Sequence, residues 1–474
     1  MDISIISNLG IVAIFLPLFY ALYLFSARLS LSFVNKKVLN WGCCFFNLLS
    51  FLFFYIVDYF SLDKAQIVKF DFNFFSIDKF SLDLGFLINE ANIGYLIFTS
   101  FLCLIFSLYS KIYFDKKKQF IFTKQRFYIF LSFVSFLTYF FIASANLFQG
   151  VIALILQSVV VLVFAYFDIF KNPTNHNITR FHRISMIGNF ALLIAVLTLF
   201  KYAILSQGYV ESNSLTYDEF DILISYMFGI SSSFEFKIMT ICFILTIMSR
   251  LMIFPLSCYY SFFANSSSIM YLTSATIVNN VAGIFLLVKT MPLLEMAKNY
   301  IFAFEVFIGI GILISLIQIL FERNIKIIFG YLLSAINSAF VILFLNLDVS
   351  LVQNSYFAFN SIFVILLMFI FLKDKTNFTK RLINKQVGFV LEKAHIIFFE
   401  TIPERTSRIV DLIDEKLLQN ISMFLVKTVN YLISLFVLRV TKTQGITSVK
   451  NILIIFAVFA LLAIFIALFG GFKC

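Results

Sequence analysis

Charged side chains are scarce in this chain. Only 13% of its 474 residues are Asp, Glu, Lys or Arg, whereas 61% are hydrophobic, and the mean hydropathy is +0.98. A soluble domain carries about 25% charged residues, so this composition excludes an ordinary soluble protein. Many stretches exceed the roughly 18 apolar residues that are needed to cross a bilayer. We therefore expect an all-α polytopic membrane protein.

The sequence also lacks the motifs of cofactor sites, metal sites and catalytic centres. Its six cysteines include no C-x-x-C pair and its three histidines are scattered, so we expect no metal and no cofactor. A Gly-rich nucleotide loop, a Ser/His/Asp set and paired carboxylates are missing too. Nothing therefore supports catalysis by this chain alone.

The net charge of +11 arises from Lys and Arg in the loops between apolar runs. These residues concentrate in alternate loops, as the positive-inside rule requires for the cytoplasmic side. This pattern favours a lipid bilayer as the surroundings and argues against a nucleic-acid partner. The same counting places the N-terminus outside.

The apolar runs predict about twelve spans in four segments. These segments are an N-terminal two-span segment (1–60), a transmembrane core (61–375) with broken helices at its centre, an amphipathic region on the cytoplasmic side (376–441) and a C-terminal transmembrane helix (442–474). Alternation in Ser61–Asp83 predicts a short hairpin outside the bilayer, with the third span beginning at about Leu84. Ile421–Leu438 fits either an interfacial or a spanning helix, so the exact span count stays open.

The most informative stretch runs from Phe236 to Thr290. Its first apolar segment carries Arg250, five positions before Pro255, and its second contains Asn279 and Asn280 at membrane depth. A cation inside an apolar span is expensive, and a broken polar helix needs a wet or protein-lined cavity. The combination favours an ion path. The alternative is that Arg250 extends from a helix end to the membrane interface.

Three other polar residues lie in or beside predicted spans. Gln157 and Asn189 interrupt apolar runs, where they either line a polar path or simply join helices by hydrogen bonds. Lys326 follows a polar segment at the start of a span, and a cytoplasmic anchor is the favoured interpretation there.

Several segments, in order, resemble conserved motifs of one family of membrane proteins. SRLMIFPL resembles K-S-A-Q-x-P-L, with Arg250 at the position of the channel lysine and Pro255 retained as the helix break. RFHRISMIGNFALLIAV resembles K-A-F-x-x-N-R-I-G-D-F-G, with Arg180 at the lysine and Asn189 at the aspartate. NIKIIFGYLLS, which contains Lys326, resembles D-I-K-R-V-L-A-Y-S-T. Together these segments resemble the antiporter-like membrane subunits of respiratory complex I, chain L or chain 5, and the related large subunits of cation/proton antiporters. The resemblance covers roughly residues 74–373 and the tail.

The resemblance implies a membrane subunit, in a bacterial cell membrane or an organellar inner membrane, that contributes to proton translocation coupled to electron transport. Redox cofactors would reside in partner subunits. The resemblance also permits a monovalent cation/proton antiporter subunit. The chain departs from the family pattern where the glutamate, histidine and lysine positions fall near Ile155, Ala275 and Ser361. These departures motivate a third hypothesis, a non-translocating membrane scaffold. In each case other membrane subunits are the expected partners.

Overall fold

Long apolar runs determine the architecture, because a helix satisfies its own backbone hydrogen bonds in lipid. The computed structural model describes residues 3–29, 35–61, 68–77, 80–116, 121–169, 175–205, 234–254, 256–258, 267–322, 324–347 and 349–373. The chain forms two units, Met1–Glu392 and Lys393–Cys474, and all described residues belong to the first. The predicted amphipathic region and the C-terminal transmembrane helix lie outside the described residues.

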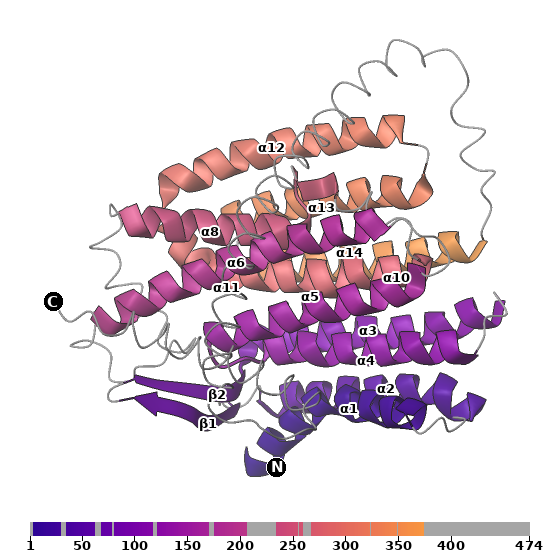
Figure 1. Ribbon diagram of the computed structural model, residues 1–474. Coiled ribbons are helices and arrows are strands. Elements are labelled where there is room, and N and C mark those ends of the chain that lie inside the picture. The colour runs from indigo at the N-terminus through magenta and orange to yellow at the C-terminus, as the bar shows by residue number, and fades with distance from the viewer. Residues whose placement is uncertain are drawn as a thin grey trace, which may run out of the picture. The chain divides into compact units, whose positions relative to one another are not determined.

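The described elements are almost entirely helical (Figure 1). They are α1 (Ile3–Leu29), α2 (Lys36–Ser61), β1 (Val68–Ile77), β2 (Phe80–Ile88), α3 (Glu90–Lys116), α4 (Ile121–Ile142), α5 (Leu147–Ile169), α6 (Asn175–Leu205), α8 (Phe234–Leu251), η2 (Leu256–Cys258), α10 (Ser268–Thr273), η3 (Ser274–Val281), α11 (Ala282–Glu295), α12 (Lys298–Phe321), α13 (Ile325–Asn346) and α14 (Val349–Lys373).

Ten helices in the described part of the chain are long and apolar enough to cross a membrane. The prediction of an all-α polytopic membrane protein is therefore confirmed. Helix α8 falls outside this set because its 18 residues include Glu235, Lys237 and Arg250. The predicted last span lies beyond the described residues, so the prediction of about twelve spans stands only as an approximate count.

The predicted hairpin exists, but it extends further than expected. Strands β1 and β2 pair antiparallel from Val68 opposite Ile88 to Ile77 opposite Phe80. The prediction that the third span begins at Leu84 is wrong, because the backbone of β2 also binds the turn between α4 and α5. The amide of Leu87 donates to the carbonyl of Ala143 at 2.9 Å.

Helix α3 begins only after the hairpin, and two asparagines set its first residue. The amide of Asn89 donates to Asn92 Oδ1 at 2.9 Å, and the amide of Asn92 donates to Asn89 Oδ1 at 3.2 Å. This reciprocal pair satisfies amides that a helix N-terminus leaves free. Asn92 Nδ2 also donates to the carbonyls of Leu87 and Ile142, which ties the helix to both neighbours.

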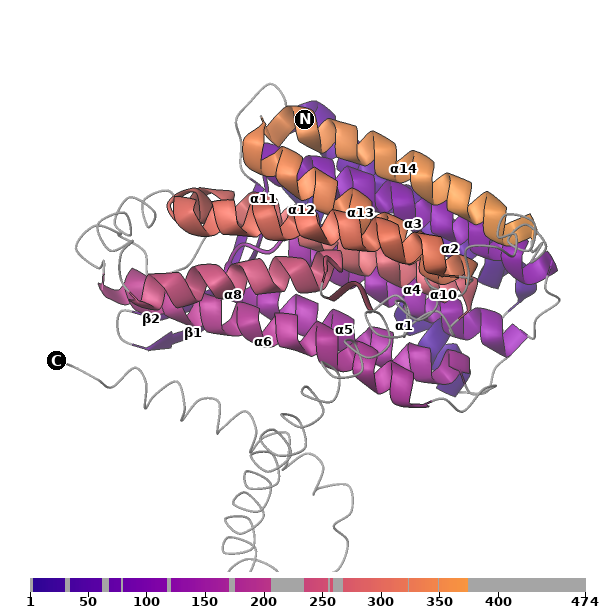
Figure 2. The same cartoon turned by 90° about the horizontal axis from the view of Figure 1, so that it is seen from above.

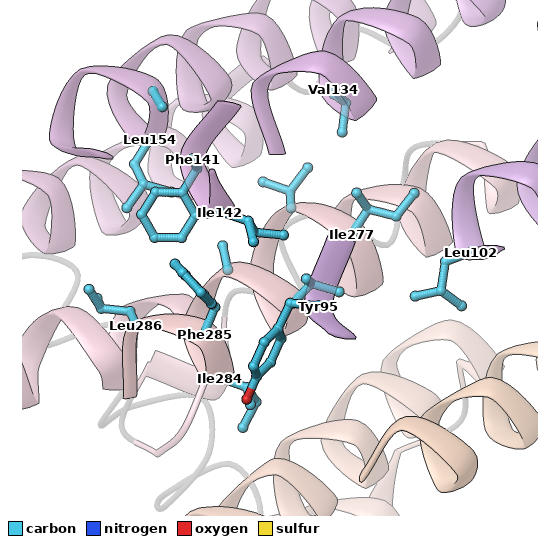
Figure 3. Close-up of a cluster of buried hydrophobic side chains, with 14 of the residues drawn as sticks. Tyr95, Leu102, Val134, Phe141, Ile142, Leu154, Ile277, Ile284, Phe285 and Leu286 are labelled. Atoms are coloured by element: carbon cyan, nitrogen blue, oxygen red, sulfur yellow. The ribbon is translucent and has the colours of Figure 1, made fainter. Parts of the chain in front are cut away.

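Helices that follow one another in the sequence also pack against one another (Figures 1 and 2). Helices α1, α2, α3 and α4 form one group, α5 packs against α4, α6 against α5, and α8 against α6. The π-helical segment η3 and α11 then return to pack against α3, α4 and α8. At this meeting point the Phe285 ring lies 5.3 Å from Tyr95 and 5.4 Å from Phe141, measured between centroids (Figure 3). This apolar layer fixes η3 and α11 beside α8.

Candidate functional site: a buried arginine beside a helix break

Arg250 is the second-to-last residue of α8 and is only 1% exposed. Its Nη2 donates to the Leu154 carbonyl at 3.1 Å, to Ser158 Oγ at 3.3 Å and, by a short bond, to Asn189 Oδ1. Its Nη1 reaches Gln157 Oε1 at 3.5 Å, the upper limit for a hydrogen bond. All four acceptors are neutral. The guanidinium is a permanent cation, so these dipoles replace part of its hydration.

The acceptors are held by further hydrogen bonds. Gln157 Nε2 donates to Thr138 Oγ1 of α4 at 2.8 Å, and Asn189 Nδ2 donates to Ser158 Oγ at 3.0 Å. Ser158 and Ser185 share a hydrogen bond of 2.9 Å. We call these side chains together with Arg250 the Arg250 network. It joins α4, α5, α6 and α8 and fixes both amides in one orientation.

The network lies deep within the apolar spans. Gln157 belongs to the span Leu147–Ala165. At 1.5 Å per residue it is about 15 Å from Leu147 and about 12 Å from Ala165, which is near the middle of a 30 Å hydrocarbon layer. The burial of Arg250 and its contacts halfway along this span favour the ion path over the alternative in which Arg250 extends to a membrane interface.

Two glycines allow neighbouring helices to approach α8 closely. A Cβ added to Gly188 would lie 2.5 Å from Ser249 Oγ, and one added to Gly283 would lie 2.6 Å from Leu251 Cδ2 and 3.1 Å from Arg250 Cβ. The close approach at Gly188 lets Thr246 Oγ1 donate to its carbonyl at 3.1 Å. Gly188 thereby places Asn189, the next residue, within reach of the guanidinium.

Helix α8 ends immediately after Arg250. Met252 has a φ of 54°, in the left-handed region that non-glycine residues seldom adopt, so the chain cannot continue the helix there. Asn337 Nδ2 donates to the Leu251 carbonyl at 2.9 Å, and Ser334 Oγ donates to the Met252 carbonyl at 2.7 Å. Helix α13 thus satisfies carbonyls that the helix end would leave free. Pro255, the predicted helix break, lies outside the described residues.

The helix break that the sequence predicts around Asn279 and Asn280 is a π-helical segment, not an interruption of the helix. Ser274–Val281 is a π-helix within the span Ser268–Glu295, and both Asn279 and Asn280 are buried in it. Asn337 Nδ2 donates to Asn280 Oδ1 at 2.9 Å as well as to the α8 end. A π segment widens the helix and is frequent at functional sites. Asn337 thereby connects the π segment with the break beside Arg250.

Two further predicted residues are Lys326 and Arg180. Lys326 is in the first turn of α13, where its amide donates to Asn324 Oδ1 and its carbonyl accepts from the Tyr271 hydroxyl at 2.7 Å. Its side chain is half-buried. Arg180 lies on α6, but its side chain is among those that the structure does not describe.

The sequence interpretation missed five contributors: Thr138, Ser158, Ser185, Ser334 and Asn337. Ser334 and Asn337 are three residues apart on α13, the spacing that puts two side chains on one helix face. This spacing could have been recognised in the sequence. The hydroxyls of the other three are too common in membrane helices to be singled out without coordinates.

These features define a class: a multi-pass helical membrane protein with a buried cation beside a broken helix and a π-helical span. A chain of the membrane-bound sulfane sulfur reductase, an archaeal respiratory membrane complex, matches the fold with a TM-score of 0.55 at 12% identity, over 76% of this chain and 70% of that one. A chain of respiratory complex I from Thermus thermophilus with bound aureothin matches with a TM-score of 0.50 at 11% identity, over 76% and 69%. No protein-family model and no curated protein matches the sequence. The predicted resemblance to complex I is thus confirmed at the level of the fold.

Proposed function

We propose that this chain is a membrane subunit of a respiratory complex that moves protons, and that the Arg250 network is the centre of its ion path. One observation carries the proposal: a guanidinium that is only 1% exposed is bound by side chains of α5 and α6 about halfway along an apolar span. Moving a cation out of water costs several kcal/mol even after relaxation. A subunit that served only as a membrane scaffold would gain nothing from burying a cation at that cost.

The network can act as a fixed positive charge along a polar route. Arginine keeps its proton, so Arg250 is not a proton carrier itself. Its field instead favours proton release from groups nearby, so removing the charge should slow the onward transfer of protons. The amides of Gln157 and Asn189 and the hydroxyls around them supply the hydrogen bonds that an excess proton needs. Asn337, which binds both Asn280 and the Leu251 carbonyl, extends this polar route to the end of α8.

The fold shared with chains of two respiratory complexes supports partner subunits that carry out the redox chemistry. A chain-L-like subunit of an NADH–quinone oxidoreductase is the first form of the proposal, and a monovalent cation/proton antiporter subunit is the second. Both place the transported ion near Arg250. They differ in their partners and in whether sodium flux accompanies proton flux.

The test begins with the native complex purified through this chain and incorporated into proteoliposomes. Co-purified NADH dehydrogenase subunits with substrate-driven proton uptake support the first form, and sodium-linked proton movement supports the second. In either assay Arg250→Met should lower the proton flux at least tenfold, about 1.4 kcal/mol of barrier. Lys201→Met, at an exposed ion pair with Glu235, is the matched control. Equal fluxes in both variants would leave only the membrane scaffold.

A further inference from the structure

A second set of buried polar side chains lies away from the Arg250 network, on α4. Lys124, Tyr128, Ser132, Ser135 and Tyr139 follow one another at spacings of three or four residues, so they share one helix face. Each is no more than 4% exposed. This face packs against α2 and α3, which contact each other and α4.

Helices α2 and α3 present polar groups to the same interface. The Cys43 thiol lies 3.8 Å from Ser132 Oγ, and Asn47 Nδ2 donates to Cys43 Sγ at 3.4 Å. The Cys103 thiol of α3 lies beside the hydroxyls of Ser135 and Tyr139. Small polar residues often simply join membrane helices, so this arrangement alone does not define a site.

Two buried amides supply the second observation. Asn40 is 6% exposed and Asn47 is 1% exposed. Within the described residues, Oδ1 of both side chains is buried and accepts no hydrogen bond. An unpaired buried polar atom costs about 1–3 kcal/mol. A bound water molecule removes that cost where a site offers several polar partners, as this interface does.

At one end of this interface lies an ion pair whose carboxylate is exposed. Lys124 Nζ binds Asp115 Oδ1 at 2.8 Å, with the lysine side chain 5% exposed and the aspartate side chain 44% exposed. From Lys124 to Tyr139 the α4 face extends about 22 Å at 1.5 Å per residue, most of a 30 Å hydrocarbon layer. It ends at the residue that follows Thr138, which accepts from Gln157 in the Arg250 network.

We propose that the interface of α2, α3 and α4 is a water-filled passage that carries protons from Asp115 to the Arg250 network. The ligand is water, held by Asn40, Asn47 and the hydroxyls and thiols between the helices. Asp115 exchanges protons with bulk water, and the file of waters and hydroxyls passes them inward by exchanging hydrogen bonds. The direction toward Arg250 depends on the proposed function, whereas the bound water does not.

Hydroxyl-radical footprinting with synchrotron X-rays tests the passage in the wild-type protein, because radicals from internal water mark the side chains beside it. Tyr139 should be oxidised about fivefold faster than Tyr271, because the proposed water lies beside Tyr139, whereas the Tyr271 hydroxyl donates to the Lys326 carbonyl at 2.7 Å. Both residues are buried, since Tyr139 is 0% and Tyr271 2% exposed. Equal oxidation of the two tyrosines would overturn the inference.

A variant then links the water to transport. Asn47→Leu should lower both Tyr139 oxidation and proton flux severalfold, while Asn354→Leu, at an exposed position of α14, changes neither. Unchanged flux in Asn47→Leu overturns the proton route. The two proposals fail separately: footprinting decides the passage, whereas Arg250→Met decides the proposed function.

Discussion

Gly188→Ala is a sharp test of how the site is assembled, because the structure provides a matched control. The new Cβ would lie 2.5 Å from Ser249 Oγ and 2.6 Å from Ser249 Cβ. Neither helix can relieve this contact by rotating a side chain, so α6 and α8 must separate. At Gly309 on α12, an added Cβ meets nothing within 4 Å. Both substitutions gain about 1 kcal/mol of helix propensity.

Overpacking costs about 1–3 kcal/mol. Separation of the helices also weakens the bonds from Thr246 to the Gly188 carbonyl and from Ser249 to the Ile184 carbonyl. Each such bond is worth about 0.6 kcal/mol within a membrane. We therefore expect a net destabilisation of about 1–3 kcal/mol, in contrast with no loss at Gly309.

The assay is thermal unfolding of the purified protein in detergent. Gly188→Ala should lower the apparent Tm by about 2–12 °C, at roughly 2–4 °C per kcal/mol, while Gly309→Ala leaves it unchanged or raises it. The double variant Gly188→Ala/Ser249→Gly moves the glycine to the opposite helix and should recover most of the loss. Equal Tm values for the two single variants would refute the close approach of α6 and α8.

Three further predictions use the same unfolding assay. Asn337→Leu should cost about 1–3 kcal/mol, because the α8 end and Asn280 lose their donor; exposed Asn354→Leu should cost nothing, and equal values would contradict the bridging role. Asp115→Asn should destabilise the protein by about 1–3 kcal/mol because it leaves the buried ammonium group of Lys124 without its carboxylate, whereas Glu235→Gln, at the exposed pair with Lys201, should change stability by less than about 1 kcal/mol. Asn92→Ala should cost about 2 kcal/mol through the lost cap and the bonds to the hairpin and α4; a wild-type Tm would show that these bonds do not hold α3.

The apolar runs carried enough information to predict the helical architecture, because length and composition decide whether a helix can span a membrane. Boundaries were harder where an element depends on distant partners. Leu84–Ile88 is as apolar as a span, yet it forms a strand because β1 and the α4–α5 turn bind its backbone. Only tertiary contacts distinguish these two outcomes.

Arg250 and Asn280 could be selected from the sequence because charge and amides are rare at membrane depth. Their partners were not predictable to the same degree. The backbone carbonyl of Leu154 leaves no trace in the residue pattern, and Gly188 acts only through the space that it leaves for Ser249. The π-helical form of Ser274–Val281 also depends on packing against α3, α4 and α8.

The measurement that tests the account most directly is proton flux through the reconstituted native complex carrying Arg250→Lys, Arg250→Met or Lys201→Met. The lysine variant keeps the charge but loses the planar fork that reaches Leu154, Ser158 and Asn189. We predict partial flux with lysine, at least a tenfold loss with methionine (about 1.4 kcal/mol) and wild-type flux with Lys201→Met. Wild-type flux with Arg250→Met in a folded, fully assembled complex would contradict the central role of the buried arginine.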